Sequence, residues 1–288
     1  MDVSIIIVNY NTKQLLANCL ATVYEQTKNI DFEVIVVDNA SIDGSEEYIK
    51  ERYPNVIWIN SGNNLGFGRA NNLGVKHATG KYLLLLNSDT LLINNAILMF
   101  FEYAESHKHE NIGAFGAHLL DINLKRNHSG GCFPTPKSEI SYCLNKLFHC
   151  RNTITPQTNS IDFIIGADLF IKRSIFNDLG GFDNNIFMYY EETDLQYRMD
   201  KAGLTRILID GPQIIHLEGG SFNNSKLSFN RLYISLRSYN YYIKKHYNIH
   251  NRILFRISLI LTKIPYILCS SLNYKEKLAC IKLIIYGE

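Results

Sequence analysis

The sequence has few cysteines, no paired metal-binding motif and no long apolar stretch that is free of charge. The cysteines lack the spacing of a zinc site and the density of a disulfide framework: Cys19, Cys132, Cys143, Cys150, Cys269 and Cys280. No basic segment followed by an apolar run and a cleavage site precedes Val3, so we expect no secretory signal. These absences predict a cytoplasmic protein without a disulfide scaffold.

Charge is nearly balanced over the whole chain but unevenly divided along it. The net charge is +2. Residues 1–224 contain 18 Lys and Arg and 25 Asp and Glu, whereas residues 225–288 contain 11 Lys and Arg and 2 Asp and Glu. A basic surface at one end favours an anionic partner for that end alone. With 46% apolar and 19% charged residues, the chain can bury a substantial core, which excludes a disordered or fibrous protein.

The apolar run Tyr82–Leu86 ends abruptly in the polar residues Asn87, Ser88 and Asp89. A run of this length suits a strand buried on both faces of a mainly parallel sheet. Ligands of open α/β sheets gather at the carboxyl ends of strands, so Asp89 would lie where a carboxylate can meet a metal ion and a phosphate. The alternative is that these residues only cap a helix beginning near Asn94.

Strands and helices alternate four times within the first ninety residues. Strands are predicted at 3–9, 32–38, 56–60 and from residue 82, and helices at 13–26, 45–52 and 68–77. This order implies right-handed crossovers and an α/β fold with a mainly parallel sheet flanked by helices. Three of the four strands end in Asn or Asp, which favours a nucleotide site along one rim, although both residues are also common in turns: Asn9, Asp38 and Asn87.

The loop that follows the third predicted strand contains Gly66 and Gly68. Glycines permit close backbone approach, and free amides at the following helix start favour an anion. A nicotinamide site is disfavoured, because the third glycine of the dinucleotide fingerprint is missing and the loop does not follow the first strand.

Five motifs, taken in order, carry a resemblance to a known family. They are Val8–Asn11, Val37–Ser45, Asn64–Gly68, Asn71–Gly74 and Leu86–Thr90. Their order and spacing resemble those of the inverting family 2 glycosyltransferases of GT-A fold, most closely the rhamnosyltransferase-like branch. Downstream, the resemblance extends to about residue 247 and includes the family's acceptor-side strand, conserved turn, acidic helix start and late histidine: Phe163–Arg173, Gly180–Asp183, Phe187–Arg198 and His216.

The resemblance implies a dTDP- or UDP-sugar donor and a divalent ion, Mg²⁺ or Mn²⁺, held by Asp89 and His216. The family's acidic triplet has a carboxylate at both ends, whereas its first position here is Asn87. The ion would therefore depend more on phosphate and water oxygens. The resemblance also implies residues that bind the nucleotide sugar. They would flank the nucleotide base, accept a hydrogen bond from its ring N–H, or line the ribose and phosphates: Asn9, Tyr10, Asp38, Asn39, Asn64, Gly68, Asn72 and Ser88.

Glu191 and Glu192 precede a helical pattern and should lie in the first turn of a helix, where the dipole favours acids. Taken alone, they could be just an acidic first turn. By position in the family motif, Glu192 is the expected catalytic base and Glu191 the reserve, with Asp194 orienting a neighbour or the acceptor. Like charges and aromatic neighbours would raise the pKa of the base toward a useful range.

Residues 225–288 place apolar side chains at helical spacing among basic ones. The apolar stretch 253–272 contains Arg256, Lys263 and Pro265, and a charge at the bilayer centre costs about 2.5–3.5 kcal/mol. Helices lying on an anionic membrane surface are therefore favoured over a spanning helix. The alternative is packing on the catalytic domain or on a second subunit of a homodimer; nucleic acid is disfavoured because no binding motif accompanies the charge.

Together these features predict three parts: a nucleotide-sugar-binding half at 1–110, an acceptor-binding half at 111–224 and a basic amphipathic helical tail at 225–288. We expect a GT-A transferase, peripheral on the inner face of the cell membrane. It would move rhamnose from dTDP-rhamnose to a lipid-linked or glycan acceptor in cell-surface polysaccharide biosynthesis, with acceptor specificity in 123–160. Alternatives are a UDP-hexose or UDP-N-acetylhexosamine transferase, a sugar nucleotidyltransferase and a catalytically silent nucleotide-sugar-binding subunit.

Overall fold

The computed structural model describes residues 1–139, 141, 161–217 and 228–287. The chain forms two compact units, of which the first comprises 1–132, 156–185 and 191–223, and the second comprises 133–155, 186–190 and 224–288. Of the segment predicted to set acceptor specificity, 123–160, residues 140 and 142–160 lie outside the described residues.

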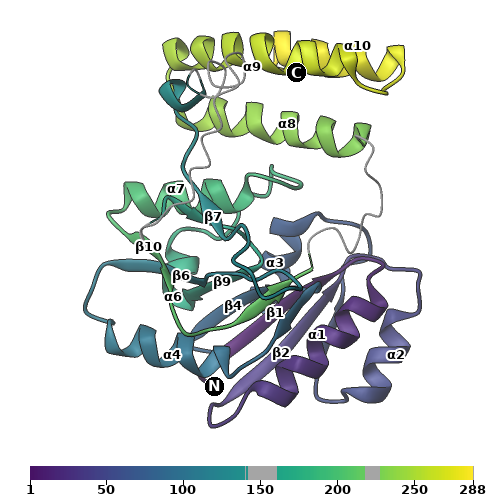
Figure 1. Cartoon of the computed structure of the whole chain (residues 1–288). Helices are drawn as coiled ribbons and strands as arrows, with labels where there is room; N and C mark the ends of the chain where they lie inside the picture. The colour runs from purple at the N-terminus through teal and green to yellow at the C-terminus, as the bar shows by residue number, and fades with distance from the viewer. Residues whose placement is uncertain (140, 142–160, 218–227, 288) are drawn as a thin grey trace. The chain divides into compact units, whose positions relative to one another are not determined.

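The first unit is built on a seven-stranded sheet with the order β10-β6-β9-β4-β1-β2-β3 (Figure 1). Only β9 runs antiparallel to its neighbours β4 and β6, so the predicted mainly parallel sheet is confirmed. The strands are β1 Val3–Asn9, β2 Phe32–Asp38, β3 Ile57–Asn60, β4 Tyr82–Asn87, β6 Ile112–Ala117, β9 Asp168–Lys172 and β10 Thr205–Ile209.

Helices cover both faces of this sheet because alternate strand residues point to opposite sides. One core joins Ile5 and Ile7 of β1 to helices α1, α2 and α4, and the other joins Ile6 to helices α3, α6 and α7. Both faces of the central strands are therefore buried, as their unbroken apolar sequences require. The helices are α1 Lys13–Gln26, α2 Ser45–Arg52, α3 Phe67–Val75, α4 Ala96–Ser106, α6 Arg173–Asp178 and α7 Glu191–Lys201.

The predicted and observed boundaries agree closely in the first ninety residues. The first two strands and the first two helices have the predicted limits, whereas β3 begins at Ile57 instead of residue 56 and α3 spans 67–75 instead of 68–77. The polar residues after β4 do not cap the next helix, because strand β5, Thr90–Leu92, intervenes and Asn95 is the N-cap of α4. Short antiparallel pairs join β5 to β11, Ile214–His216, and β7, Gly130–Gly131, to β8, Phe163–Ile164.

The second unit ends in three helices, α8 Phe229–His246, α9 Ile249–Cys269 and α10 Tyr274–Tyr286. They pack through apolar side chains such as Tyr242 of α8, Phe255 of α9 and Ile284 of α10, all nearly inaccessible to solvent. In the part of the chain that the structure describes, no helix is long and apolar enough to cross a membrane. The predicted helical C-terminal extension is present as α8, α9 and α10.

Candidate functional site

Parallel pairing brings the polar ends of three strands to one edge of the sheet. Asn9 of β1 lies opposite Asp38 of β2, and Val8 lies opposite Asn87 of β4. Asn9 Nδ2 donates to Asp38 Oδ1 at 2.7 Å and to Ser41 Oγ at 3.0 Å, and its Oδ1 accepts from the Thr12 hydroxyl at 2.7 Å. These hydrogen bonds, of which those to Asp38 and from Thr12 are buried, fix the rim that the sequence predicted.

The same network reaches the polar triplet at the end of β4. The hydroxyls of Thr12 and Ser88 are 3.1 Å apart, which joins Ser88 to Asn9 through one side chain. Both carboxylate oxygens of Asp38 already accept protein hydrogen bonds, because Ser41 N–H donates to Oδ2 at 2.9 Å. Tyr10, by contrast, is about half exposed, with 49% of its surface accessible, so its ring is available to a ligand.

The loop before α3 is shaped by two asparagines from the predicted set. Asn39 Nδ2 donates to Gly66 O at 3.2 Å, and Asn64 Oδ1 accepts from Gly66 N–H at 3.0 Å. Gly66 has φ +83°, a left-handed backbone conformation that favours glycine. Glycine suits the close packing at residue 68, since a Cβ there would lie only 3.0 Å from Phe182 Cβ.

Asp89 and His216 meet although they are far apart in sequence. Antiparallel pairing of β5 with β11 sets His216 opposite Thr90, and Leu217 N–H donates to Asp89 O at 2.9 Å. The His216 Nε2 to Asp89 Oδ1 distance is 3.4 Å, and both side chains are mostly buried. The structure thus brings together the two side chains that the sequence predicted as metal ligands.

The donor atoms at this pair suit a partly hydrated hard cation. Within the described residues, no three His, Cys, Asp or Glu side chains converge to hold a metal ion. One carboxylate oxygen and one imidazole nitrogen can nevertheless serve as two ligands, with phosphate and water oxygens completing the shell of Mg²⁺ or Mn²⁺.

Glu191 and Glu192 begin α7, as predicted. Glu191 is buried, and no hydrogen-bond donor among the described residues reaches its Oε2. The pKa of Glu191 is raised well above its ordinary value, first by burial and then by the charge of Glu192. Burial also raises the pKa of Glu192, against the effect of backbone hydrogen bonds that include Gly166 N–H, which donates to Glu192 Oε1 at 3.1 Å. The pair therefore retains a proton more readily than exposed carboxyls do.

One short segment connects Glu192 to the end of β4. Gly166 N–H holds the Glu192 carboxylate, and Ala167 O of the next residue accepts from Asn87 N–H at 3.0 Å. The candidate base and the Asn87–Asp89 triplet thus contact neighbouring residues of the same backbone turn. Gly166 is also sterically restricted, because a Cβ there would lie 2.7 Å from Glu192 Oε1.

Asp168 is a buried acid outside the set of residues predicted to bind the donor or the metal or to act as the base. It begins β9, is fully buried and accepts from Ala117 N–H through Oδ2 at 2.6 Å. Burial raises its pKa to about 7, although the hydrogen bond from Ala117 and the nearby His216 both lower it. The available sequence signal is a single acid within the apolar segment 163–171, because a lone charge is costly in a buried strand.

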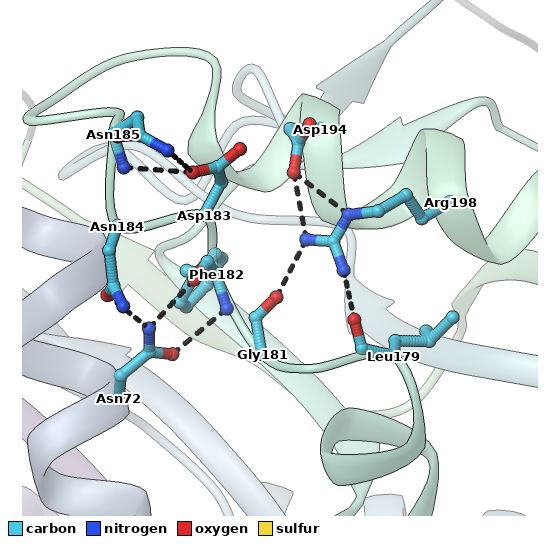
Figure 2. A network of polar contacts seen from close by, with 9 residues as sticks. All are labelled: Asn72, Leu179, Gly181, Phe182, Asp183, Asn184, Asn185, Asp194 and Arg198. Carbon is cyan, nitrogen blue, oxygen red and sulfur yellow. Dashed lines mark hydrogen bonds and ion pairs between the residues drawn. The ribbon is translucent and has the colours of Figure 1, made fainter. Parts of the chain in front are cut away.

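Asn72 and Asp194 organise the loop between α6 and α7 (Figure 2). The Asn72 side chain donates to Phe182 O at 2.8 Å and accepts from Phe182 N–H at 2.9 Å. Asp194 binds Arg198, whose guanidinium also donates to the carbonyl oxygens of Leu179 and Gly181. The amide of Asn72 is therefore engaged with the loop, and Asp194 orients a neighbouring residue.

Comparisons with known proteins agree with this architecture. Residues 4–180 match the family model of Glycosyl transferase family 2. The chain is 26% identical over 238 residues to an N-acetylglucosaminyl-diphospho-decaprenol L-rhamnosyltransferase of Mycobacterium tuberculosis, covering 74% of this chain and 75% of that protein. It is 27% identical over 227 residues to the rhamnosyltransferase WbbL of Escherichia coli K12, covering 74% of this chain and 83% of WbbL.

A solved structure shares the fold at low sequence identity. The mannosyltransferase PcManGT from Pyrobaculum calidifontis, in complex with GDP-Man and Mn²⁺, superposes with a TM-score of 0.61 and 16% identity. The match covers 99% of this chain and 87% of PcManGT. Since the family match spans more than half of the sequence and the sheet has the expected topology, the chain belongs to glycosyl transferase family 2 and is a glycosyltransferase.

Proposed function

We propose that the protein is an inverting rhamnosyltransferase, which moves rhamnose from dTDP-rhamnose to a lipid-linked or glycan acceptor in cell-surface polysaccharide biosynthesis. The observation that carries the proposal is the link from Glu192 through Gly166 and Ala167 to the Asn87–Asp89 triplet. It gives one edge of the sheet both a base and a phosphate-side carboxylate. The rhamnosyltransferase names of the two relatives favour the deoxyhexose donor.

In this mechanism Glu192 removes the proton of the acceptor hydroxyl while the oxygen of that hydroxyl attacks the anomeric carbon of the sugar. The bond from that carbon to the diphosphate breaks, so the configuration inverts and a nucleoside diphosphate leaves. A base of this kind needs a pKa raised toward the working pH, which burial supplies here. Glu191 helps by keeping a proton and thereby limiting the negative charge beside Glu192.

Asp89 and His216 would hold a Mg²⁺ or Mn²⁺ ion through Oδ1 and Nε2. When bound, such an ion would supply positive charge opposite the leaving diphosphate. Asn87 supplies no second carboxylate, so Asp89 and His216 would leave more of the ion's coordination to diphosphate and water oxygens. The chain's own contribution is to fix Asp89 and His216 side by side through the β5–β11 pair.

Donor recognition is proposed for the rim of Asn9, Asp38, Asn39 and Ser88 and for the exposed ring of Tyr10. Asn64 and Gly68 would shape the loop near the phosphates, and Asn72 would act through the 181–185 loop. The Asp38 carboxylate already accepts two protein hydrogen bonds, one at each oxygen. An N–H of the nucleotide base would therefore have to share one of the Asp38 oxygens with a protein donor.

The decisive experiment measures product release from a panel of nucleotide sugars with and without Mg²⁺ or Mn²⁺. We expect metal-dependent release of dTDP from dTDP-rhamnose and little release from UDP-glucose or UDP-N-acetylglucosamine. Preferential use of a UDP-sugar would contradict the donor assignment. Release of pyrophosphate from a nucleoside triphosphate and a sugar phosphate would instead identify a nucleotidyltransferase.

We further propose that residues 225–288 attach the enzyme to an anionic membrane surface, as suits a transferase with a lipid-linked acceptor. The net charge of this segment and its exposed apolar side chains support attachment. Pairing of these helices in a homodimer is the competing arrangement, and sedimentation of the lipid-free protein distinguishes the two.

A further inference from the structure

A cavity of about 330 Å³ lies among the helices of the second unit. Its walls come from α8, α9 and the end of α10, and they are mainly apolar, with Ile243, Ile253 and Ile260 among the lining residues. This volume falls in the range of sites that take small ligands or part of a larger one. The cavity belongs entirely to the second unit.

Helix α9 shows two apolar faces, only one of which is used inside the unit. Phe255 and Leu259 are buried. On another face, Ile249, Ile253 and Ile257 recur every four residues and are 60%, 51% and 47% exposed. A regular row of large exposed apolar side chains is typical of a surface that meets another apolar phase.

Three cations stand at the same cavity: Lys244 from α8, and Arg252 and Arg256 from α9. Arg252 Nε donates to Tyr247 O at 2.7 Å, and its guanidinium also contacts Lys244 O, so the α8–α9 corner is fixed. Lys244 and Arg256 are exposed. Among the described residues, none of these three cations forms an ion pair, and the cavity lining contains no carboxylate.

We propose that this cavity is a binding site for an anionic phospholipid. The lipid phosphate would be held by Lys244 and Arg256, and the adjoining apolar part would enter the cavity beside Ile253. The exposed row of α9, which also lines this cavity, would then lie in the membrane interface. The inference rests on the membrane attachment proposed above and deepens it, because it names a lipid class and the residues that recognise it.

Charge complementarity favours an anionic phospholipid over a second copy of the chain and over a zwitterionic lipid. A second copy of the chain docked symmetrically on this face would bring like charges together, which is unfavourable without intervening acids. A zwitterionic lipid offers the same apolar chain but no net negative charge. An anionic phospholipid satisfies both the cations and the apolar walls.

The test is flotation of the full-length protein with vesicles of phosphatidylglycerol and phosphatidylcholine, compared with vesicles of phosphatidylcholine alone. We expect binding only to the anionic vesicles and a loss of about tenfold or more for Lys244→Gln combined with Arg256→Gln. The matched control, Lys275→Gln with Lys282→Gln, removes the same charge from exposed positions on α10 outside the cavity. It should weaken binding far less; equal losses in the two double variants would overturn the proposal.

A soluble short-chain phosphatidylglycerol separates a binding site from general surface attraction. Below its micelle concentration it should bind the wild-type protein saturably and the Lys244→Gln, Arg256→Gln variant at least about tenfold more weakly. Absence of saturable binding would overturn the proposal. Binding to neutral vesicles only when they carry polyprenyl phosphate would also overturn it, in favour of the lipid portion of an acceptor. Circular dichroism verifies that each variant is folded.

The transferase assignment is tested separately with dTDP-rhamnose and a water-soluble acceptor. The double variant should keep wild-type transfer in that assay, since neither Lys244 nor Arg256 is among the residues proposed for transfer. Lipid binding without any transfer by the wild type would reject the enzyme function alone. Transfer without lipid binding would reject the lipid site alone.

Discussion

The two glutamates that begin α7 differ in what contacts them. Glu192 Oε1 receives the Gly166 N–H, whereas Glu191 is buried against the packing surface of Gly68 and Phe182. A carboxylate with a directional hydrogen bond and partial exposure suits proton transfer. A buried one without a donor at Oε2 suits the neutral form. The pair thus divides the roles of base and neutral neighbour by environment.

Replacing the base tests this division. Glu192→Gln should reduce turnover by about 10²- to 10⁴-fold, because the amide cannot accept the acceptor proton. Donor affinity should remain near the wild-type value, since no hydrogen bond among the described residues joins the Glu192 side chain directly to the nucleotide rim. Turnover is measured by nucleoside diphosphate release and affinity by calorimetry. Full activity in a variant that melts at the wild-type temperature would refute the assignment.

Asp168 makes a pH-dependent contribution to stability whose sign follows from its raised pKa. Between the ordinary value of 3.8 and about 7, the folded state holds a proton that the unfolded state has released. The contribution of Asp168 is therefore greatest below pH 3.8 and is lost as the pH rises to about 7. Asp168→Asn should remove this dependence.

Thermal melting of both proteins at pH 5 and pH 8 measures the effect. The melting temperature of Asp168→Asn relative to wild type should be higher at pH 8 than at pH 5, because the amide carries no buried charge at either pH. An exposed acid, Asp210→Asn, is the control and should show little such change. A difference that is the same at both pH values would show that Asp168 does not titrate in this range.

At the scale of elements, the turn between β8 and β9 positions the site. Its Gly166 and Ala167 contact the base and the end of β4, so β9 aligns α7 with the nucleotide edge. The antiparallel direction of β9 makes this possible, since its first residues lie at the edge where parallel β4 ends. A parallel β9 would place its start at the opposite edge.

Gly166→Ala probes this arrangement without removing a functional group. The added methyl would lie 2.7 Å from Glu192 Oε1 and 2.8 Å from Phe67 Cε1, so the carboxylate must move. We expect turnover to fall by about tenfold or more with little change in donor affinity, because a small misplacement of a catalytic group is costly. The steady-state rate and donor affinity are measured together.

Gly203→Ala provides the matched control for that substitution. Gly203 has φ +75° and no heavy atom within 4 Å of the added Cβ. It should therefore lose about 1 kcal/mol of stability from backbone strain and keep its turnover. Equal loss of turnover in both variants would show that the Gly166 effect is a general folding defect.

At the scale of the whole molecule, a nearly neutral chain carries two segments of opposite charge balance, 1–224 and 225–288. The segment 225–288 has 11 basic and 2 acidic residues, and α9 adds exposed apolar side chains to that charge. Such a surface combines electrostatic attraction with apolar insertion. The two contributions respond differently to salt.

Raising the salt concentration separates those contributions. Binding of the full-length protein to anionic vesicles should weaken strongly between 0.1 M and 1 M salt, as the Debye length falls from about 10 Å to about 3 Å. Ile253→Ser with Ile257→Ser should weaken binding at both concentrations and leave the salt dependence largely unchanged. Flotation measures both effects, and salt-independent binding of the wild type would contradict an electrostatic attachment.

The α/β class and most of the early helix and strand limits followed from the sequence, because buried parallel strands and their polar ends leave a regular local pattern. The family followed from the resemblance carried by five motifs. The sequence also placed Glu191 and Glu192 in the first turn of a helix. Packing in three dimensions was needed to fix the 3.4 Å contact of Asp89 with His216, the hydrogen bond from Gly166 to Glu192 and the burial of Asp168. Those contacts join residues distant in sequence through strand pairing and close packing, which no local periodicity encodes. The cavity of the second unit has the same origin: its cations and apolar walls belong to different helices, and only their packing brings them together.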